Sequence, residues 1–261
     1  MTADEYMHAI INKYRLIDKP IRTSVLAPQI STAAFVQAGL NPYIKKWAGK
    51  YLINIMLSGS SAKGTAIIGN TDVDLFISLN SLTPGTLKEI YYSLGNYLAG
   101  KGFEVRAQNV SIGMNYKGKK VDLVPARVQL GFKNYHSLYK RKSDSWIQTN
   151  ISQHIGLVRN YGRINEIIAL KIWRELNGID FPSIYLELSV IEALRYKLKN
   201  QLVKNLITVF EYLSHDFIDK VIVDPSNSNN IISDELYKRD KQIIAKKARE
   251  SLKMACNEVF Y

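Results

Sequence analysis

Three aspartates lie inside short apolar segments that have the pattern of β-strands. Asp72 and Asp74 belong to the run Thr-Asp-Val-Asp-Leu-Phe-Ile-Ser, and Asp122 lies within Val-Asp-Leu-Val-Pro. Because residues i and i+2 of a strand point to the same face, Asp72 and Asp74 are expected on one face of a sheet, with Val73 and Leu75 on the other. Two carboxylates about 4 Å apart repel by roughly 4 kcal/mol at an effective dielectric near 20, and a third anion adds to this.

This grouping of carboxylates favours a divalent cation. Carboxylate oxygens suit Mg²⁺ or Mn²⁺, and two such ions can hold the attacking and leaving oxygens of an in-line phosphoryl transfer. An Asp-x-Asp pair alone is a weak signal, because paired acids are common at exposed strand ends. The joint pattern is more specific, since a strand over residues 51–57 and a Ser-Gly-Ser-Ser turn precede the acidic strand, and a third acid follows. We therefore predict a site for two metal ions formed by Asp72, Asp74 and Asp122.

The turn before the acidic strand is a candidate phosphate-binding segment. Gly59 permits a backbone conformation that brings N–H groups close to a phosphate, and the hydroxyls of Ser60 and Ser61 add further donors. The alternative is an ordinary loop, which the acids downstream disfavour.

Length, charge and cysteine content narrow the class of protein. A chain of 261 residues fits one or two domains, and its single cysteine, Cys256, excludes an internal disulfide framework and a cysteine zinc cluster. The sequence starts without the features of a signal peptide and contains no apolar run of membrane-spanning length, so we expect a soluble cytoplasmic protein without membrane insertion. The net charge of +12 favours polyanionic partners, although much of it lies in helical stretches and is equally explained as a solvated helix face.

The order of the expected elements indicates an α+β fold, in which a mixed sheet with flanking helices is followed by a helical bundle. We place the domain boundary in the polar, basic stretch 135–145, which gives a catalytic domain over residues 1–140 and a helical domain over residues 141–261. A helix over 30–47 is expected to break at Gly39 and Pro42, and another is expected to start with Thr83 as N-cap and Pro84 at its first position. Further strands are predicted over 103–108, 110–116, 119–125 and 127–132, and further helices over 151–161, 164–177, 184–199, 202–219 and 233–259.

Two residues of the helical half are candidates for binding phosphate. Ile164, Ile167 and Ile168 form an apolar stripe at helical spacing, and Lys171 continues it. A lysine in this position either meets an anion, such as a triphosphate, or extends its amine to the solvent. Ser183 opens the next helix, where unsatisfied N–H groups favour a phosphate, although a routine helix cap is the simpler role.

These motifs resemble the DNA polymerase beta-like nucleotidyltransferases. The likeness is to the branch that holds archaeal-type CCA-adding enzymes, oligoadenylate synthases, cyclic GMP-AMP synthase and the CD-NTases of bacterial anti-phage signalling. It is carried by Gly-Ser-Ser-Ala-Lys-Gly-Thr, by the two acidic strands and by later stretches that extend it over residues 51–232. The later stretches are Trp146-Ile-Gln-Thr-Asn with His154, Leu170-Lys171-Ile-Trp173, Ser183-Ile-Tyr185-Leu-Glu187-Leu and Val223-Asp224-Pro225-Ser-Asn227-Ser-Asn229-Asn230.

The resemblance implies roles for individual residues. Asp72, Asp74 and Asp122 are implied to bind the metal ions, with Asp122 placed to help activate the attacking hydroxyl. The triphosphate is implied to contact Gly59, Ser60, Lys171 and Ser183, and Tyr185 to stack on the base. Lys63 is a further candidate because it follows the Gly-Ser turn, with a surface lysine as the alternative. For Asp224–Asn230 a structural role across the helical domain is expected.

Departures from the family pattern narrow the resemblance to a small bacterial signalling enzyme. The chain is too short to hold the additional tRNA-gripping domains of CCA-adding enzymes, and one cysteine excludes the zinc-binding insertion of cyclic GMP-AMP synthase. The sequence ends in Tyr261, which by default is a frayed terminus or a packing contact. The short length and terminal tyrosine also resemble the nucleotidyltransferases of the Hailong anti-phage system, which are thought to build DNA oligomers on a tyrosine of the enzyme itself.

The sequence thus predicts a template-independent nucleotidyltransferase (EC 2.7.7 type) that makes a nucleotide or oligonucleotide signal in anti-phage defence. Its expected partners are nucleoside triphosphates, with ATP or dATP favoured, its oligonucleotide product and a downstream membrane effector. The resemblance to the Hailong enzymes implies oligodeoxyadenylate primed by Tyr261 as the product. One alternative is an enzyme that transfers nucleotides to tRNA or to a protein, and another is an inactive nucleotide-binding sensor.

Overall fold

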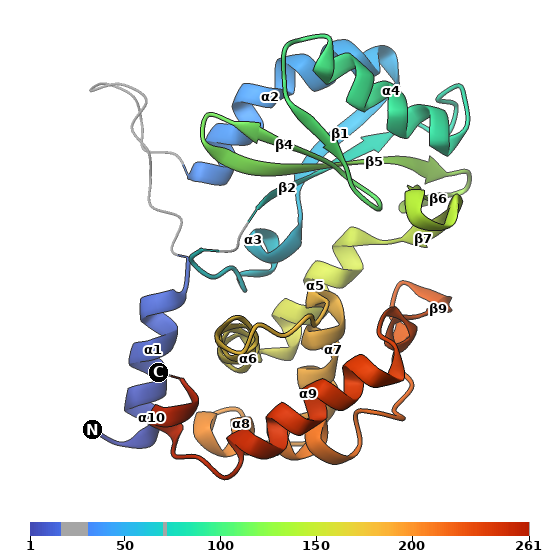
Figure 1. The fold of residues 1–261 in the computed structure, drawn as a ribbon. Coiled ribbons are helices and arrows are strands. Elements are labelled where there is room, and N and C mark those ends of the chain that lie inside the picture. Colours follow the sequence, from blue (N-terminus) through green and yellow to red (C-terminus); the bar gives the residue numbers. More distant parts are fainter. Residues whose placement is uncertain (17–30, 70–71, 261) are drawn as a thin grey trace, which may run out of the picture. The chain divides into compact units, whose positions relative to one another are not determined.

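The computed structural model describes residues 1–16, 31–69 and 72–260, and the chain divides into two units (Figure 1). The helical unit comprises Met1–Leu16, Gly64–Gly69 and Gly156–Tyr261, and the sheet unit comprises Ile17–Lys63 and Asn70–Ile155. The division therefore falls near residue 155, whereas a boundary at residue 140 was predicted from the sequence. The helical unit also takes up two earlier segments of the chain, which the sequence gave no reason to expect.

The sheet unit is built on seven strands in a mixed sheet. Its main path runs β1-β2-β5-β4-β3, and β6 and β7 extend it from β5. β2 and β5 are parallel, and the other pairs are antiparallel. The strands are β1 (Leu52–Leu57), β2 (Val73–Leu79), β3 (Val105–Ala107), β4 (Ile112–Tyr116), β5 (Lys119–Gln129), β6 (Phe132–Lys140) and β7 (Ser145–Thr149).

The two faces of this sheet differ in what covers them. Helices α2 (Thr32–Ala48) and α4 (Leu87–Ala99) pack on one face, where alternate residues of β2 and β5, such as Leu75 and Leu123, enter a large buried cluster. The opposite face carries the smaller cluster of Phe76, Ala126 and Leu138. Asp74 and Asp122 belong to this second face, because each lies two residues before an apolar member of it.

Helix α2 is continuous through Pro42, so the predicted break is wrong. Pro42 removes a single backbone donor, and the stripe of Val36, Leu40 and Ile44 at i, i+4 and i+8 is fully buried and holds the helix on the sheet. Gly39 lets the side chain of Tyr116 pack directly against the backbone of α2, because a Cβ at residue 39 would lie 2.2 Å from the hydroxyl oxygen of Tyr116.

Three other expectations for the sheet unit need correction. The N-cap of α4 is Thr86, which forms a capping box with Glu89, whereas the hydroxyl of Thr83 donates to the carbonyl of Asn80 at 2.6 Å. The strands predicted over 119–125 and 127–132 are a single strand, β5, because Pro125 pairs in parallel register with Ile77 without interrupting it. The stretch predicted to be the boundary forms most of β6.

The helical unit buries one apolar core. Its members come from helices throughout the unit, including Met7 and Ile11 near the start of the chain and Val259 and Phe260 near its end. The elements are α1 (Ala3–Tyr14), α6 (Ile164–Leu176), α7 (Ser183–Ala193), α8 (Leu202–His215), α9 (Lys238–Ser251) and α10 (Cys256–Val259), with α5 (Ile151–Tyr161) leading in from the sheet unit and the hairpin β8 (Val223–Asp224) and β9 (Asn227–Ile231) between α8 and α9.

The helices predicted over 151–161 and 164–177 are confirmed, and the later ones are shorter than expected. The helix predicted over 184–199 ends at Ala193, and the one over 202–219 ends at His215. The last predicted helix is divided into a 3-10 turn, α9 and α10. In the part of the chain that the structure describes, none of the helices combines the length and apolar character that crossing a membrane requires.

Candidate functional site

The structure brings two of the three predicted acids side by side in the sheet unit. Asp74 of β2 and Asp122 of β5 are direct partners in the parallel register. Asp72 immediately precedes β2 and is close enough to Asp122 to interact with it electrostatically. All three side chains are partly buried. The sequence-based expectation of carboxylates from neighbouring strands on one face is confirmed for Asp74 and Asp122.

Gly59 makes direct room for the carboxylate of Asp74. A Cβ at this position would lie 1.7 Å from Asp74 Oδ2, and Gly59 has φ of +60°, a conformation that favours glycine. The backbone N–H of Ser58 donates to the carbonyl of Asp74 at 2.9 Å. Ser58 and Gly59, which directly follow β1, are therefore fitted closely to the first acid of β2.

The segment predicted as a Gly-Ser turn forms a short helix, α3 (Gly59–Lys63). Ser60, Ser61 and Lys63 are all partly buried in it. They therefore accompany Gly59 beside β2, and their contact with a phosphate stays a prediction.

The carboxylate of Asp122 is held by two side chains that the sequence did not single out. Gln108 Nε2 donates to Oδ1 at 2.9 Å, and Ser111 Oγ donates to Oδ2 at 3.4 Å and to Gln108 Oε1 at 3.0 Å. Burial raises the pKa of Asp122, and the nearby charge of Asp72 raises it further, whereas the donors and Arg106 oppose the shift. Gln108 and Ser111 lie in the turn between β3 and β4. Only the pairing of the strands shows that this turn reaches Asp122.

The acids of the sheet unit have the donor chemistry of a magnesium or manganese site. Each carboxylate oxygen offers more than one lone pair, and the absence of a side chain at Gly59 leaves room for Asp74 Oδ2. As the side chains lie here, none of the described parts of the chain holds three or more Asp, Glu, His or Cys residues grouped as a metal site. The predicted site for two ions stays a prediction.

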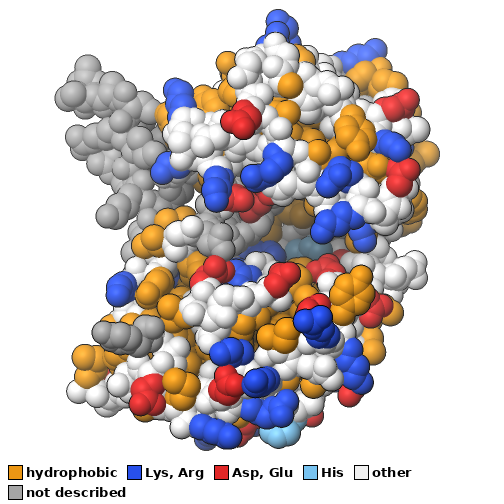
Figure 2. Space-filling view, viewed as in Figure 1, with side chains coloured by type: hydrophobic (Ala, Val, Ile, Leu, Met, Phe, Trp, Pro, Cys, Tyr) orange, Lys and Arg blue, Asp and Glu red, His pale blue; other side chains and the backbone are white. Residues whose placement is uncertain are grey.

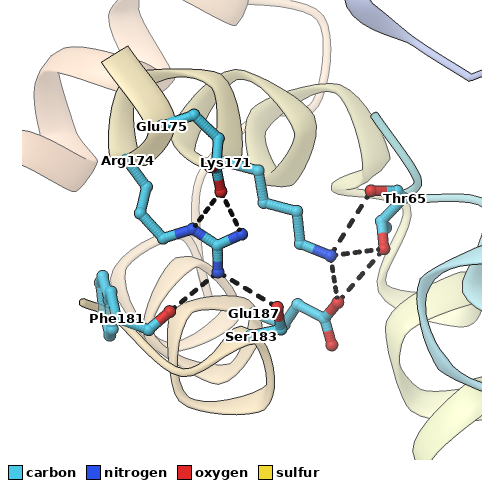
Figure 3. A network of polar contacts seen from close by, with 7 residues as sticks. All are labelled: Thr65, Lys171, Arg174, Glu175, Phe181, Ser183 and Glu187. Atoms are coloured by element: carbon cyan, nitrogen blue, oxygen red, sulfur yellow. Dashed lines mark hydrogen bonds and ion pairs between the residues drawn. The ribbon is translucent and has the colours of Figure 1, made fainter. Parts of the chain in front are cut away.

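Lys171 lies in a buried polar network within the helical unit (Figure 3). Its Nζ lies 2.8 Å from Glu187 Oε1 and donates to Thr65 Oγ1 at 2.9 Å. Thr65 Oγ1 in turn donates to Glu187 Oε1 at 3.2 Å. Lys171 therefore does not extend to the solvent, which removes one of the two predicted alternatives. Glu187 supplies the anion that Lys171 needs. The glutamate of the Tyr-Leu-Glu run was the sequence feature from which this partner could have been predicted.

Ser183 at the start of α7 is exposed and lies next to a second cation. Arg174 Nη1 donates to Ser183 Oγ at 3.1 Å and to the carbonyl of Phe181 at 2.8 Å, while its Nη2 lies 2.8 Å from Glu175 Oε1 (Figure 3). Arg174 follows Lys171 by three residues on α6, so a helical reading of the sequence could have identified it.

Tyr185 does not fit its predicted role at the base. Its side chain is fully buried, and its ring packs against Phe181 and Phe217 at centroid distances of 5.4 Å and 5.0 Å. A base has no free face of this ring on which to stack. Tyr185 is a core residue, and the aromatic side chain in the Ser-x-Tyr run was misread because its burial depends on partners that are distant in the sequence.

Tyr261 lies outside the described residues. Its neighbours Val259 and Phe260 are buried in the core of the helical unit, at 9% and 3% exposure. The end of the chain is thus anchored by two apolar side chains up to the residue before the tyrosine.

The net positive charge is not collected into one patch on the face shown in Figure 2, where Lys and Arg side chains are interspersed with Asp and Glu. Several of the cations have acidic partners, as in the pairs Lys88–Asp144 and Lys238–Asp219. Total charge alone therefore does not locate a binding surface for a polyanion.

Solved structures of CD-NTases resemble this chain in fold. CdnG of Bradyrhizobium diazoefficiens, determined in complex with GTP, superimposes with a TM-score of 0.73 and 13% identity over 95% of this chain and 90% of its own. CdnC of E. coli MS115-1 with ATP gives a TM-score of 0.72 and 22% identity over 88% and 84%. The cyclic dinucleotide synthase CdnE of Elizabethkingia meningoseptica, with GTP and Apcpp, gives 0.68 and 14% over 95% and 99%.

The sequence itself matches no protein-family profile, and no curated protein matches it. All three structures are less than 25% identical to it, so the likeness is one of fold. The chain has the CD-NTase fold, which confirms the fold implied by the resemblance, and the narrower likeness to the Hailong enzymes stays a prediction.

Proposed function

We propose that this chain is a metal-dependent, template-independent nucleotidyltransferase that makes an oligonucleotide signal in anti-phage defence. The observation that carries the proposal is the pairing of Asp74 with Asp122 across parallel strands, with Gly59 fitted against Asp74. The CD-NTase fold supports it, since the structures with this fold include proteins bound to ATP or GTP.

The proposed reaction joins an acceptor hydroxyl to the α-phosphorus of a nucleoside triphosphate. A new O–P bond forms, the bond between the α-phosphorus and the bridging oxygen breaks, and pyrophosphate leaves with the electron pair. Asp122 helps to take the proton from the acceptor hydroxyl, because it lies beside Asp74 and its carboxylate is oriented by Gln108 and Ser111. Mg²⁺ or Mn²⁺ bound to Asp72, Asp74 and Asp122 would neutralise charge on the attacking and leaving oxygens.

The remaining residues of the sheet unit are proposed to hold the triphosphate. Gly59, Ser60 and Ser61 supply backbone and hydroxyl donors next to β2, and Lys63 adds a cation to the same short helix. For Lys171 and Ser183, a contact with the triphosphate stays a prediction.

Within this activity we propose oligodeoxyadenylate, started on the hydroxyl of Tyr261, as the product. The support is the resemblance to the Hailong nucleotidyltransferases, which are thought to build DNA oligomers on a tyrosine of the enzyme itself. The effector that responds to the product is proposed to be a membrane protein.

Incubation with labelled ATP, dATP, GTP and dGTP, with and without tRNA, tests the function. We expect the wild-type protein to incorporate label without a template or tRNA, and Asp74→Asn to lose incorporation at an unchanged melting temperature. Asp180→Asn, which removes an exposed carboxylate from the helical unit, is the matched control and should stay active. Label that enters only tRNA would support the tRNA-modifying alternative, and nucleotide binding without incorporation would support the sensor.

A further inference from the structure

A row of four directly paired residues crosses the sheet on the face that carries the acids. Asp74 pairs with Asp122, Asp122 with Gly113 of β4, and Gly113 with Arg106 of β3. Residues that are direct partners in neighbouring strands project to the same face of the sheet. Arg106 is therefore on the same face as the proposed catalytic carboxylates, two strands away from Asp122.

Gly113 makes room for the side chains of Arg106, Asp122 and Gln108, which meet over its backbone. A Cβ at Gly113 would lie 3.2 Å from both Arg106 Nη2 and Asp122 Oδ1, and 2.6 Å from Gln108 Nε2. The side chain of Arg106 is exposed and forms no hydrogen bond or ion pair with another described residue, although its charge acts on Asp122. The row thus ends in a guanidinium group that is available to an anion.

The strand order indicates whether this anion belongs to the donor triphosphate or to the acceptor. The proposed triphosphate-binding residues of α3 lie beside β2, on one side of Asp122, and β4 and β3 continue the sheet on the other side. In an in-line transfer, the attacking hydroxyl approaches opposite to the leaving pyrophosphate. If the pyrophosphate leaves towards α3, the acceptor lies over β4 and β3.

We propose that Arg106 binds a phosphate group of the acceptor, so that the preferred acceptor is a nucleotide or the 3′ end of an oligonucleotide. This inference rests on the proposed function and names the acceptor class for the same site. Strands are about 4.8 Å apart, so β3 lies about 10 Å from β5, a distance that one nucleotide and an arginine side chain together can span. A guanidinium group donates two parallel hydrogen bonds to a phosphate and stays protonated throughout, so Arg106 positions the acceptor and takes no proton.

The test measures binding of donor and acceptor separately. The acceptor probe is a fluorescent, 5′-phosphorylated adenine tetranucleotide, in ribose and deoxyribose forms, and the donor probe is 3′-deoxyadenosine triphosphate, which has no attacking 3′-hydroxyl. The variant is Arg106→Ala. The matched control is Lys119→Ala, because Lys119 is an exposed cation of β5 whose partner Tyr116 packs on the opposite face of the sheet.

We expect Arg106→Ala to weaken tetranucleotide binding about tenfold, as for the loss of one charge-assisted contact, and to leave donor affinity unchanged. A tetranucleotide with neutral methylphosphonate linkages and no 5′-phosphate should bind the wild-type protein as weakly as the charged one binds Arg106→Ala. Unchanged tetranucleotide affinity in Arg106→Ala, an equal loss in Lys119→Ala, or an equal loss of donor affinity would each overturn the inference. A wild-type protein that binds neither probe would contradict the proposed function itself.

Discussion

Lys171 Nζ lies 2.8 Å from Glu187 Oε1, and the two side chains are only 3% and 1% exposed. An ion pair this deeply buried is costly to break on one side, because the remaining charge has no water around it. The same lysine was predicted from the sequence to contact a triphosphate. Stability and triphosphate affinity therefore have to be separated in any variant of Lys171.

Lys171→Met should lower the free energy of unfolding by about 3 to 5 kcal/mol, because Glu187 is left buried without its cation. The double variant Lys171→Met/Glu187→Met removes both charges and should lose much less. Chemical denaturation of the two variants beside the wild-type protein measures the difference. A double variant that is less stable than Lys171→Met would contradict the ion pair.

The same double variant tests the predicted contact with the triphosphate. If Lys171 reaches the triphosphate when substrate is bound, the folded double variant should bind 3′-deoxyadenosine triphosphate about tenfold more weakly than the wild-type protein, since a charge-assisted contact is lost. Calorimetry provides the measurement. An unchanged affinity would leave Lys171 with a purely structural role.

Gly59→Ala should abolish nucleotide incorporation, because the new methyl group would occupy the place of Asp74 Oδ2. Gly102→Ala is the matched control, since Gly102 also has a positive φ, of +82°, but has no other atom within 4 Å of its Cβ position. Both variants should lose about 1 kcal/mol of stability from backbone strain. Incorporation assays beside melting curves distinguish the two effects, and a Gly59→Ala protein as active as Gly102→Ala would rule out the close fit to Asp74.

His136 should make the sheet unit less stable in mild acid. Its ring is buried, with Nε2 2.8 Å from Ser78 Oγ and an edge-on contact to Phe76, and burial lowers its pKa below the usual value of about 6.5. The unfolded chain therefore binds a proton before the folded one does. The stability contribution of neutral His136 is fully present above the unfolded pKa and is lost as pH falls from about 6.5 towards the folded pKa.

Melting temperatures between about pH 7.5 and pH 5 measure this effect, with variants that cannot titrate. His136→Phe should flatten the pH profile, whereas His8→Phe, on the exposed side of α1, should retain the wild-type slope. Equal slopes in all three proteins would show that His136 is not responsible.

Tyr261→Phe should remove any nucleotides attached to the protein without lowering the melting temperature. It keeps the ring and removes only the oxygen that would attack the α-phosphorus. Tyr237→Phe is the control, because Tyr237 is 83% exposed and offers another accessible phenol. In intact-protein mass spectra, a ladder of nucleotide masses should appear in the wild-type and Tyr237→Phe proteins. An unmodified wild-type chain beside free product would refute priming by Tyr261.

The sequence predicted the sheet face with its acids because strand alternation is a local property that tertiary context rarely changes. The neighbouring positions of Asp74 and Asp122 followed from two short apolar segments of this kind. Predictions from local patterns were wrong where contacts with residues far away in the sequence determined the structure. Pro42 stays inside its helix because the helix packs on the sheet, the ring of Tyr185 is covered by Phe217, and Lys171 is paired with Glu187. Gln108 and Arg106 were missed because only the pairing of β3, β4 and β5 brings them to the acids.

The threading of the chain through two units has a consequence for synthesis on the ribosome. Met7 and Ile11 of α1 are buried against residues that come from the last hundred positions of the chain, and Arg15 forms a β-bridge with Ile67. All strands of the seven-stranded sheet are complete by Thr149. The nascent sheet can therefore fold early, whereas the first helix has to wait for partners that are made after the sheet, in α6, α8 and α10.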